Sequence, residues 1–214
     1  GQQCQLHPME FQALVESGDL QRSYSTEDYQ QRIEQRLPSD CSEEQLSQQL
    51  RLFRRRELIR IIWRDFSRQA PLLEITADMT AMAESAINAS LSVLHRITSE
   101  ELGTPCREGT KDDSQGKIEQ HMIVVAMGKM GAQELNISSD IDLIFAYPRK
   151  GETRRPESSP RQKTVSNQEF FTRLGQKLIA ALDKKTVDGF VFRVDMRLRP
   201  YGQSGALVLS FDAL

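Results

Sequence analysis

The first hundred residues carry apolar side chains at intervals of three and four positions, the pattern of helices that bury one face. This pattern predicts three helices, over residues 23–37, 41–71 and 77–101. Ser25 and Asp28 stand at capping-box spacing at the start of the first helix, and Pro38 ends it. We expect Met79 and Met82, in the third helix, to belong to the core.

The long second helix has two distinct faces. We expect its buried face to consist of five apolar residues, Leu52, Ile59, Ile62, Trp63 and Phe66. Arg56, Arg60 and Arg64 follow one another at intervals of four, so they share another face. That face is either a solvated surface or an anion-binding edge, and spacing alone favours the solvated surface.

After residue 103 the pattern changes from helical to β. Residues 102–117 are polar, contain Gly and Pro, and are interpreted as a connector. Short β-branched and apolar runs predict strands over residues 121–127, 138–147, 190–200 and 205–211. The charged, Pro- and Ser-containing residues 148–166 are interpreted as a mobile loop.

An amphipathic helix is expected between the second and third strands, over residues 166–185. Ser166 or Asn167 can cap it, and its buried stripe is Phe170, Leu174, Leu178 and Leu182. The order of elements predicts an α+β chain. We expect a helical N-terminal region over residues 1–115, followed by a mixed sheet with packed helices over residues 116–214.

Composition narrows the function classes. The 214 residues carry a net charge of −2, which argues against a broad nucleic-acid-binding surface. No apolar run approaches the roughly 20 residues needed to cross a bilayer, and the start resembles no signal peptide. Three widely spaced cysteines favour free thiols in a reducing cytosol. His7, His95 and His121 are scattered along the chain, which argues against a zinc site.

Two aspartates, Asp140 and Asp142, interrupt the apolar strand over residues 138–147. Alternate side chains of a strand share a face, so both carboxylates point the same way, opposite Ile141 and Leu143. Neighbouring carboxylates repel unless a cation lies between them, and Mg²⁺ or Mn²⁺ prefers such oxygen ligands. Surface strands also carry acids, so this pair alone leaves a metal role open.

The strand over residues 190–200 supplies a third acid. Alternation places Asp195 on a polar face with Val191, Arg193 and Arg197. If the two strands are neighbours, three carboxylates converge and can hold two metal ions about 4 Å apart. An Asp–Arg ion-pair ladder would also explain Asp195, but it leaves the acid pair on the other strand unexplained.

The turn after the first strand carries further candidates. Gly128 and Gly131 allow the backbone to approach a ligand, and the following N–H groups can receive phosphate. Lys129 is either a phosphate contact or an ordinary exposed lysine. Ser138 and Ser139 either bind phosphate or shape the start of the strand.

The order of strand, glycine turn, aspartate pair and later acid resembles the polymerase-β-like nucleotidyltransferases. The segments GKMGAQELNISSDIDLIF, FFTRLGQKLIAALD and DGFVFRVDMRLRPYGQSGALVLSF closely resemble the glutamine synthetase adenylyltransferase family. The resemblance runs from about residue 45 to the C-terminus. Lys129 replaces the Gly or Ser usual in the superfamily, and Ala206 replaces an expected proline; neither touches the carboxylates.

The resemblance implies a role for each candidate residue. Asp140, Asp142 and Asp195 would bind Mg²⁺ or Mn²⁺ and act as the catalytic carboxylates. The residues implied in binding a nucleotide (ADP or ATP) and phosphate are Gly128, Lys129, Gly131, Ser138, Ser139, Arg197 and Arg199. The implied partners are glutamine synthetase and a PII-type signalling protein, in the cytoplasm, with no nucleic acid and no membrane.

That family has two nucleotidyltransferase halves, one that attaches AMP to a tyrosine of glutamine synthetase and one that removes it by phosphorolysis. The wording around the aspartates and the helical lead-in resemble the removing half. Adenylylation from ATP is the first alternative, and a non-catalytic module that binds a PII-type protein is the second. Because the family continues beyond SFDAL, the chain is interpreted as a fragment.

Overall fold

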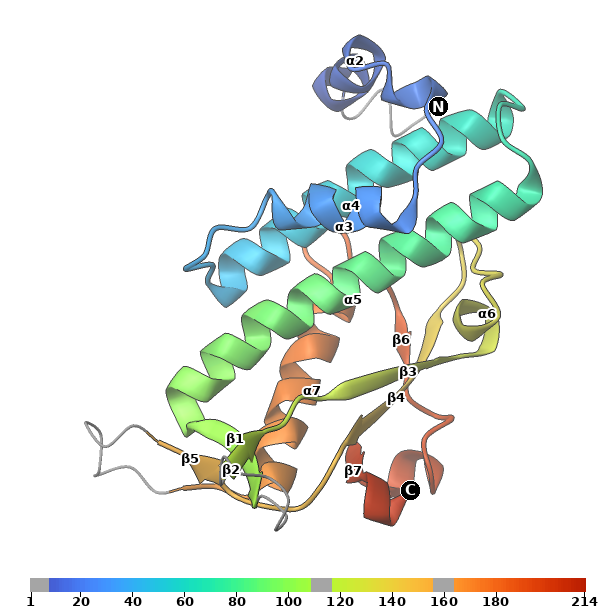
Figure 1. Ribbon diagram of the computed structural model, residues 1–214. Helices are drawn as coiled ribbons and strands as arrows, with labels where there is room; N and C mark the ends of the chain where they lie inside the picture. Colours follow the sequence, from blue (N-terminus) through green and yellow to red (C-terminus); the bar gives the residue numbers. More distant parts are fainter. Residues whose placement is uncertain (1–7, 109–116, 156–163) are drawn as a thin grey trace.

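A computed structural model of the chain describes residues 8–108, 117–155 and 164–214, and its helices lie against a small mixed sheet (Figure 1). The helical elements of the first half are α2 (Pro8–Glu16), η1 (Asp19–Gln21), α3 (Thr26–Glu34), α4 (Glu43–Phe66) and α5 (Leu72–Leu102). The α+β prediction is confirmed, and none of the described helices is long and apolar enough to cross a membrane.

The helix starts follow the capping chemistry of the sequence. Ser25 and Asp28 form the expected capping box on α3, and Ser42 forms a second one with Gln45 on α4. The expected third helix begins earlier than predicted, at Leu72, directly after Pro71. Each box satisfies two N–H groups that a helix start would otherwise leave unpaired.

The expected buried face of α4 is wrong except at Ile59, which is buried. Trp63 is 40% exposed and Phe66 83% exposed, whereas Arg60 is fully buried and Arg64 nearly so. The apolar residues of α4 that do enter the core are Leu46, Leu50, Phe53, Ile59 and Ile61. The arginine face is buried because carboxylates on neighbouring elements form ion pairs with it. Hydrophobic periodicity does not predict ion pairs between elements, so this burial could not be expected from the sequence.

The second half builds the sheet that carries the acids. Its elements are β3 (Ile123–Met127), α6 (Gly128–Gly131), β4 (Ile141–Tyr147), α7 (Asn167–Asp183), β6 (Val194–Asp195), η2 (Gly202–Ser204), β7 (Val208–Ser210) and η3 (Phe211–Ala213). In this four-stranded sheet β3 pairs antiparallel with β4, while β6 and β7 both pair parallel with β4. The mixed sheet is therefore as expected, with β4 at its centre.

Helix α7 packs between α5 and the sheet (Figure 1). Ser166 caps it, and its expected stripe of Phe170, Leu174, Leu178 and Leu182 is fully buried. Gly175 allows the close approach, because a Cβ there would lie 3.0 Å from the Phe145 ring on β4. Most buried apolar residues of the helices and the sheet form one core cluster, and Leu14, Leu20 and Ile59 form a second, smaller one.

The third predicted strand is much shorter than expected. Only Val194 and Asp195 pair with β4, and the consecutive residues Val191 and Phe192 are both buried. Their backbone N–H groups both donate to the carbonyl oxygen of Leu182, at 2.8 and 3.0 Å. This anchor at the end of α7 breaks the alternation, so Val191 does not belong to the polar face.

A second sheet was not anticipated. It consists of β1 (Thr104–Glu108), β2 (Lys117–Glu119) and β5 (Thr153–Arg154), in the order β2-β1-β5. β1 lies in the segment interpreted as a connector and β5 in the segment interpreted as a loop, because both segments are polar, and β2 begins at the last residue of the connector. The predicted domain boundary at residues 115 and 116 lies outside the described residues, as does the centre of the predicted loop.

Candidate active site

The carboxylates meet where β4 and β6 run side by side. Asp142 pairs with Asp195 in the parallel register, and Met127 at the end of β3 pairs with Asp142 from the other side. Asp140 lies one residue before β4, where the N–H of Ile141 donates to the carbonyl of Arg193 at 2.9 Å. The neighbouring strands required for convergence are thus present.

Alternation along β4 is as predicted. Ile141 and Leu143 are fully buried, whereas Asp142 is partly exposed and Asp140 is exposed. The apolar side chains fix the strand in the core, and this leaves the carboxylates on the opposite face. The cost of burying two charges is avoided, because neither acid is fully removed from water.

Arginines contact two of the three acids. The Arg193 guanidinium donates to Asp140 and, at 2.5 Å, to the carbonyl of Ser138. Arg197 donates to Asp195 from its backbone N–H at 2.8 Å and from Nε at 2.8 Å. These hydrogen bonds lower the pKa of the Asp195 carboxyl below its ordinary value.

The charges of all three acids act on the guanidinium of Arg197. Its pKa is raised, first by the hydrogen bond to Asp195 and further by the charges of Asp142 and Asp140. Among the described residues, no hydrogen bond or ion pair reaches the Asp142 carboxylate. The Asp–Arg ladder therefore accounts for two acids and leaves Asp142 available to a ligand.

The glycine turn lies directly against this group. Gly128 has a φ of +54°, and a Cβ on it would collide with Oδ2 of Asp142. A Cβ on Gly131 would lie 2.6 Å from the carbonyl oxygen of Ala126. Lys129 is exposed at the same turn. The backbone therefore follows the acid surface more closely than any residue with a side chain would allow.

The two serines serve the start of β4 in this structure. Oγ of Ser139 donates to Oδ1 of Asn136 at 2.8 Å, and the N–H of Ser138 donates to the same oxygen at 3.1 Å. These bonds form a side-chain turn of the kind that Asn favours. Their alternative role in phosphate binding stays a prediction.

A small cavity of about 310 Å³ opens beside the acids. Asp140, Asp195, Arg197 and Arg199 line it. Arg199 donates to the carbonyls of Met196, at 2.9 Å, and Gln203, at 3.4 Å. Its Nε is buried and has no hydrogen-bond partner among the described residues. This N–H group can therefore still donate a hydrogen bond to a ligand.

The family model for glutamate-ammonia ligase adenylyltransferase matches residues 1–214. The chain belongs to this family. It is 50% identical over 201 residues to a bifunctional glutamine synthetase adenylyltransferase/adenylyl-removing enzyme of Pseudomonas aeruginosa, and these residues cover 94% of the chain and 19% of the relative. The relative of the same name in Nitrosococcus oceani is 48% identical over 201 residues, 94% of this chain and 20% of its own length. The chain thus spans about a fifth of the length of the curated relatives it matches.

The donor set of the three acids fits a hard divalent ion. The acids offer only oxygen ligands, and Gly128 allows the backbone of the turn to lie directly against Asp142. In the described chain, however, the three acids do not approach one another closely enough to share one ion as they stand. Arg193 and Arg197 hold two of them, so a metal ion would have to compete with both guanidinium groups.

Sequence reasoning missed one cluster. His95 and His121, treated as scattered, lie together with Glu119, with ring centroids of the two histidines 4.7 Å apart. Their separation of 26 positions along the chain gave no signal, because helix α5 and the segment after β2 meet only in the fold. Cys41 is a buried free thiol, in agreement with the expectation for that residue, and Cys106 is also buried.

Proposed function

We propose that this chain is a nucleotidyltransferase centre that removes AMP from the adenylylated tyrosine of glutamine synthetase. In this reaction an oxygen of inorganic phosphate forms a bond to the adenylyl phosphorus. The bond from phosphorus to the tyrosine oxygen breaks, ADP leaves, and the tyrosine oxygen takes up a proton. The observation that carries the proposal is the in-register pairing of Asp142 and Asp195 beside the Gly128 turn.

The three acids would hold Mg²⁺ or Mn²⁺. When bound, such an ion activates the attacking oxygen and stabilises the charge that develops on the leaving oxygen. Asp142 is already available, and Asp140 and Asp195 become so when Arg193 and Arg197 turn toward phosphate oxygens. Two guanidinium groups then change partner from carboxylate to phosphate, which preserves charge-assisted hydrogen bonds throughout.

The remaining site residues would position the nucleotide and the phosphate. Arg199, with its free buried donor, would bind a phosphate oxygen at the cavity wall. The backbone between Gly128 and Gly131, with Lys129, would contact the same groups from the opposite side. These donors would bind the phosphate oxygens, while the carboxylates would bind the metal ion.

Adenylylation from ATP is the competing direction, and it would use the same acids. The relatives' names include both activities, so the sequence wording around the aspartates is what favours removal. Phosphate-dependent release of ADP from adenylylated glutamine synthetase would support removal. ATP-dependent labelling of glutamine synthetase, without ADP release, would support the reverse assignment.

The decisive variant is Asp140→Asn in the intact enzyme. We expect it to abolish removal of AMP while the fold is retained, because the amide cannot replace a charged ligand. Asp65→Asn, which neutralises an exposed acid on α4 far along the chain, is the matched control and keeps wild-type activity. Normal deadenylylation by the Asp140 variant would contradict the proposal.

Partners and compartment follow from this activity. Glutamine synthetase is the substrate, and a PII-type signalling protein is the proposed regulator, both in the cytoplasm. A purely regulatory module would bind the PII-type protein without any divalent-ion requirement. Absence of Mg²⁺ or Mn²⁺ binding in a titration of the chain would favour that module over the enzyme.

A further inference from the structure

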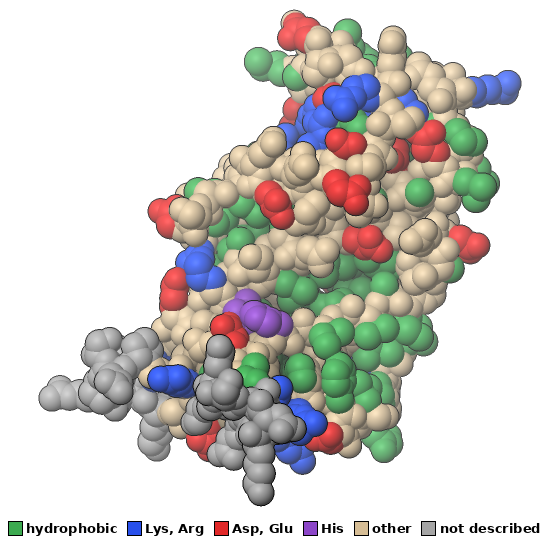
Figure 2. Space-filling view, viewed as in Figure 1, with side chains coloured by type: hydrophobic (Ala, Val, Ile, Leu, Met, Phe, Trp, Pro, Cys, Tyr) green, Lys and Arg blue, Asp and Glu red, His purple; other side chains and the backbone are tan. Residues whose placement is uncertain are grey.

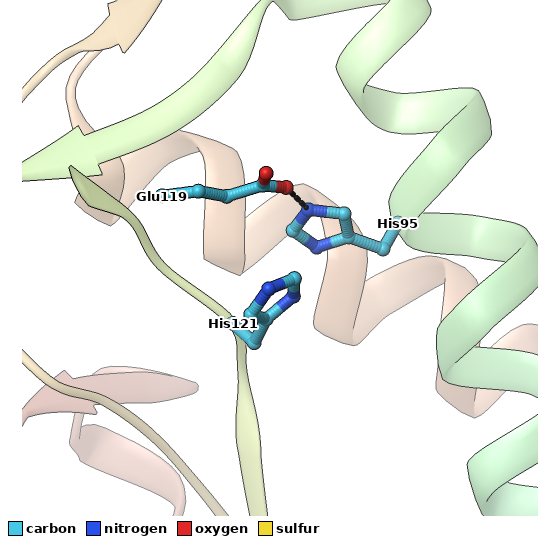
Figure 3. Close-up of side chains that lie close together, drawn as sticks. All are labelled: His95, Glu119 and His121. Carbon is cyan, nitrogen blue, oxygen red and sulfur yellow. Dashed lines mark hydrogen bonds and ion pairs between the residues drawn. The ribbon is translucent and has the colours of Figure 1, made fainter. Parts of the chain in front are cut away.

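Three side chains of types that bind metal ions lie close together beside α5, near strand β2 of the second sheet (Figure 3). His95 comes from α5, Glu119 from the end of β2, and His121 from the segment that leads to β3. One ligand atom from each lies within 4.8 Å of the other two. In the described part of the chain, this is the only group of three or more such side chains that close.

We propose that His95, Glu119 and His121 form a binding site for Zn²⁺ or a similar late first-row divalent ion, separate from the carboxylate site. Two imidazoles and one carboxylate are a ligand set of zinc sites that keep an open position. Mg²⁺ is disfavoured there because it prefers oxygen ligands. The two sites therefore differ in the kind of ion they select.

The spacing already approaches that of bound ligands. Nε2 of His95 lies 3.0 Å from Oε1 of Glu119. Ligand atoms at tetrahedral angles around zinc, with bonds of about 2 Å, lie about 3.3 Å apart. This pair would separate by only a few tenths of an ångström, and His121 would complete the set by rotating its exposed side chain toward them.

A plain hydrogen bond explains His95 and Glu119 but not His121. Two imidazole rings with centroids 4.7 Å apart would repel if both were protonated. Burial lowers the pKa of His95, the charge of His121 lowers it further, and the Glu119 bond partly opposes this. A metal ion bound by the three side chains would account for His121 as well, because it binds both imidazole rings in their neutral form.

The framework around the cluster is fixed on two sides. The His95 ring packs edge-on against Phe170 of α7, with centroids 5.4 Å apart. Glu119 is held by the β1–β2 ladder, where it pairs with Cys106. Metal affinity increases when ligands are positioned in advance, because less conformational entropy is lost on binding.

The open coordination position of a bound ion would face a cavity. The three side chains line a cavity of about 830 Å³, whose wall also includes Arg96 and Glu100. Histidine side chains are visible at the surface on this side of the molecule (Figure 2). A bound ion would therefore be accessible to solvent, and it would link α5 to the segment that starts β3.

The test is a zinc titration of the 214-residue chain against a chromophoric chelator, with Co²⁺ as a spectroscopic substitute. We expect one tight equivalent of Zn²⁺ and a Co²⁺ visible spectrum typical of four-coordination. His121→Ala and Glu119→Gln should each weaken zinc binding by at least about tenfold. Both side chains are exposed, so neither substitution disturbs the core, and circular dichroism verifies this.

Two controls separate this site from its surroundings. Glu100→Gln removes an acid from the same cavity but not from the cluster, and should retain wild-type affinity. Asp142→Asn changes the carboxylate site and should also retain the tight equivalent. The proposal is overturned if the wild-type chain binds no zinc, or if only Asp142→Asn loses it while the cluster variants keep it.

Discussion

Gly128 lies directly against the carboxylate of Asp142, at a distance that leaves no space for a Cβ atom. The glycine also has a left-handed backbone, with φ of +54°. Two separate constraints, conformation and space, therefore require glycine at the turn that follows β3. The lack of space concerns Asp142, the one acid of the site that forms no ion pair with an arginine among the described residues.

Gly128→Ala should therefore damage the site more than the fold. We expect about 1 kcal/mol of lost stability from the left-handed backbone and about a 100-fold loss of nucleotidyl transfer from the displaced carboxylate. Gly18→Ala is the matched control, since Gly18 has φ of +72° but no atom near its Cβ position. Full activity of the Gly128 variant in the intact enzyme would show that Asp142 does not need its present position.

Arg197 and Asp195 give a prediction about metal affinity. Arg197→Ala should tighten Mn²⁺ binding by roughly tenfold, because it frees Asp195 and removes a charge that repels the metal ion. Turnover should fall in the same variant, since the guanidinium is lost as a phosphate ligand. Mn²⁺ electron paramagnetic resonance measures the affinity and a deadenylylation assay the turnover.

Arg199→Ala is the comparison for this experiment. Arg199 donates to two backbone carbonyls and to none of the acids, so its loss should not free a carboxylate. We expect a smaller gain in Mn²⁺ affinity from this variant than from Arg197→Ala. Equal gains from the two would mean that general charge, and not competition for Asp195, controls metal binding.

The sequence allowed the acid pair to be placed because strand alternation is a local rule. Ile141 and Leu143 fix the orientation of Asp142 whatever lies beside the strand. The third acid was expected beside the pair only on the condition that the two strands are neighbours, and the pairing of β4 with β6 meets this condition. The length of β6 was not predictable, because it depends on the carbonyl of Leu182 at the end of another element.

The incorrect prediction of the buried face of α4 also results from contacts between residues far apart in the sequence. Arg60 resembles a surface residue by type, and only the fold brings Asp78 to it. Periodicity therefore assigned the wrong face of α4 to the core. The histidine cluster was missed for an equivalent reason, since His95 and His121 share no local pattern.

The buried pair of Arg60 and Asp78 should be essential for stability. Nη1 of Arg60 donates to Oδ2 of Asp78 at 3.0 Å and to the Tyr29 hydroxyl at 2.9 Å, with both charged side chains almost fully buried. Asp78→Asn leaves the guanidinium charge without its counter-charge, and we expect a loss of about 3 kcal/mol in unfolding free energy. Urea denaturation monitored by circular dichroism measures it.

An exposed pair supplies the control. Glu169 and Arg173 form an i,i+4 pair on α7 with both side chains about half exposed, so Glu169→Gln should cost at most about 0.5 kcal/mol. The double variant Arg60→Met/Asp78→Leu should recover much of the loss, because it removes both buried charges. If Asp78→Asn is no more destabilising than Glu169→Gln, the buried pair contributes little.

Asp19 should make stability depend on acid pH. Burial alone would raise its pKa, but the hydrogen bond from Arg56 and the charge of Arg32 outweigh burial and lower it. A lowered folded-state pKa stabilises the fold above the unfolded-state value, about 3.9, and this contribution is lost as pH falls toward the lower folded value. We therefore expect the unfolding free energy to decrease progressively below about pH 4.

Asp19→Asn should remove roughly 2 kcal/mol at neutral pH and flatten the decline at acid pH, because the amide has no proton to gain. Urea denaturation at intervals between neutral pH and acid pH measures both effects. Ser39→Ala, an exposed substitution that removes no carboxylate, should keep the wild-type pH profile. An Asp19 variant with an unchanged acid slope would show that other carboxylates cause the acid sensitivity, and that the contacts from Arg56 and Arg32 do not bind Asp19 preferentially in its charged form.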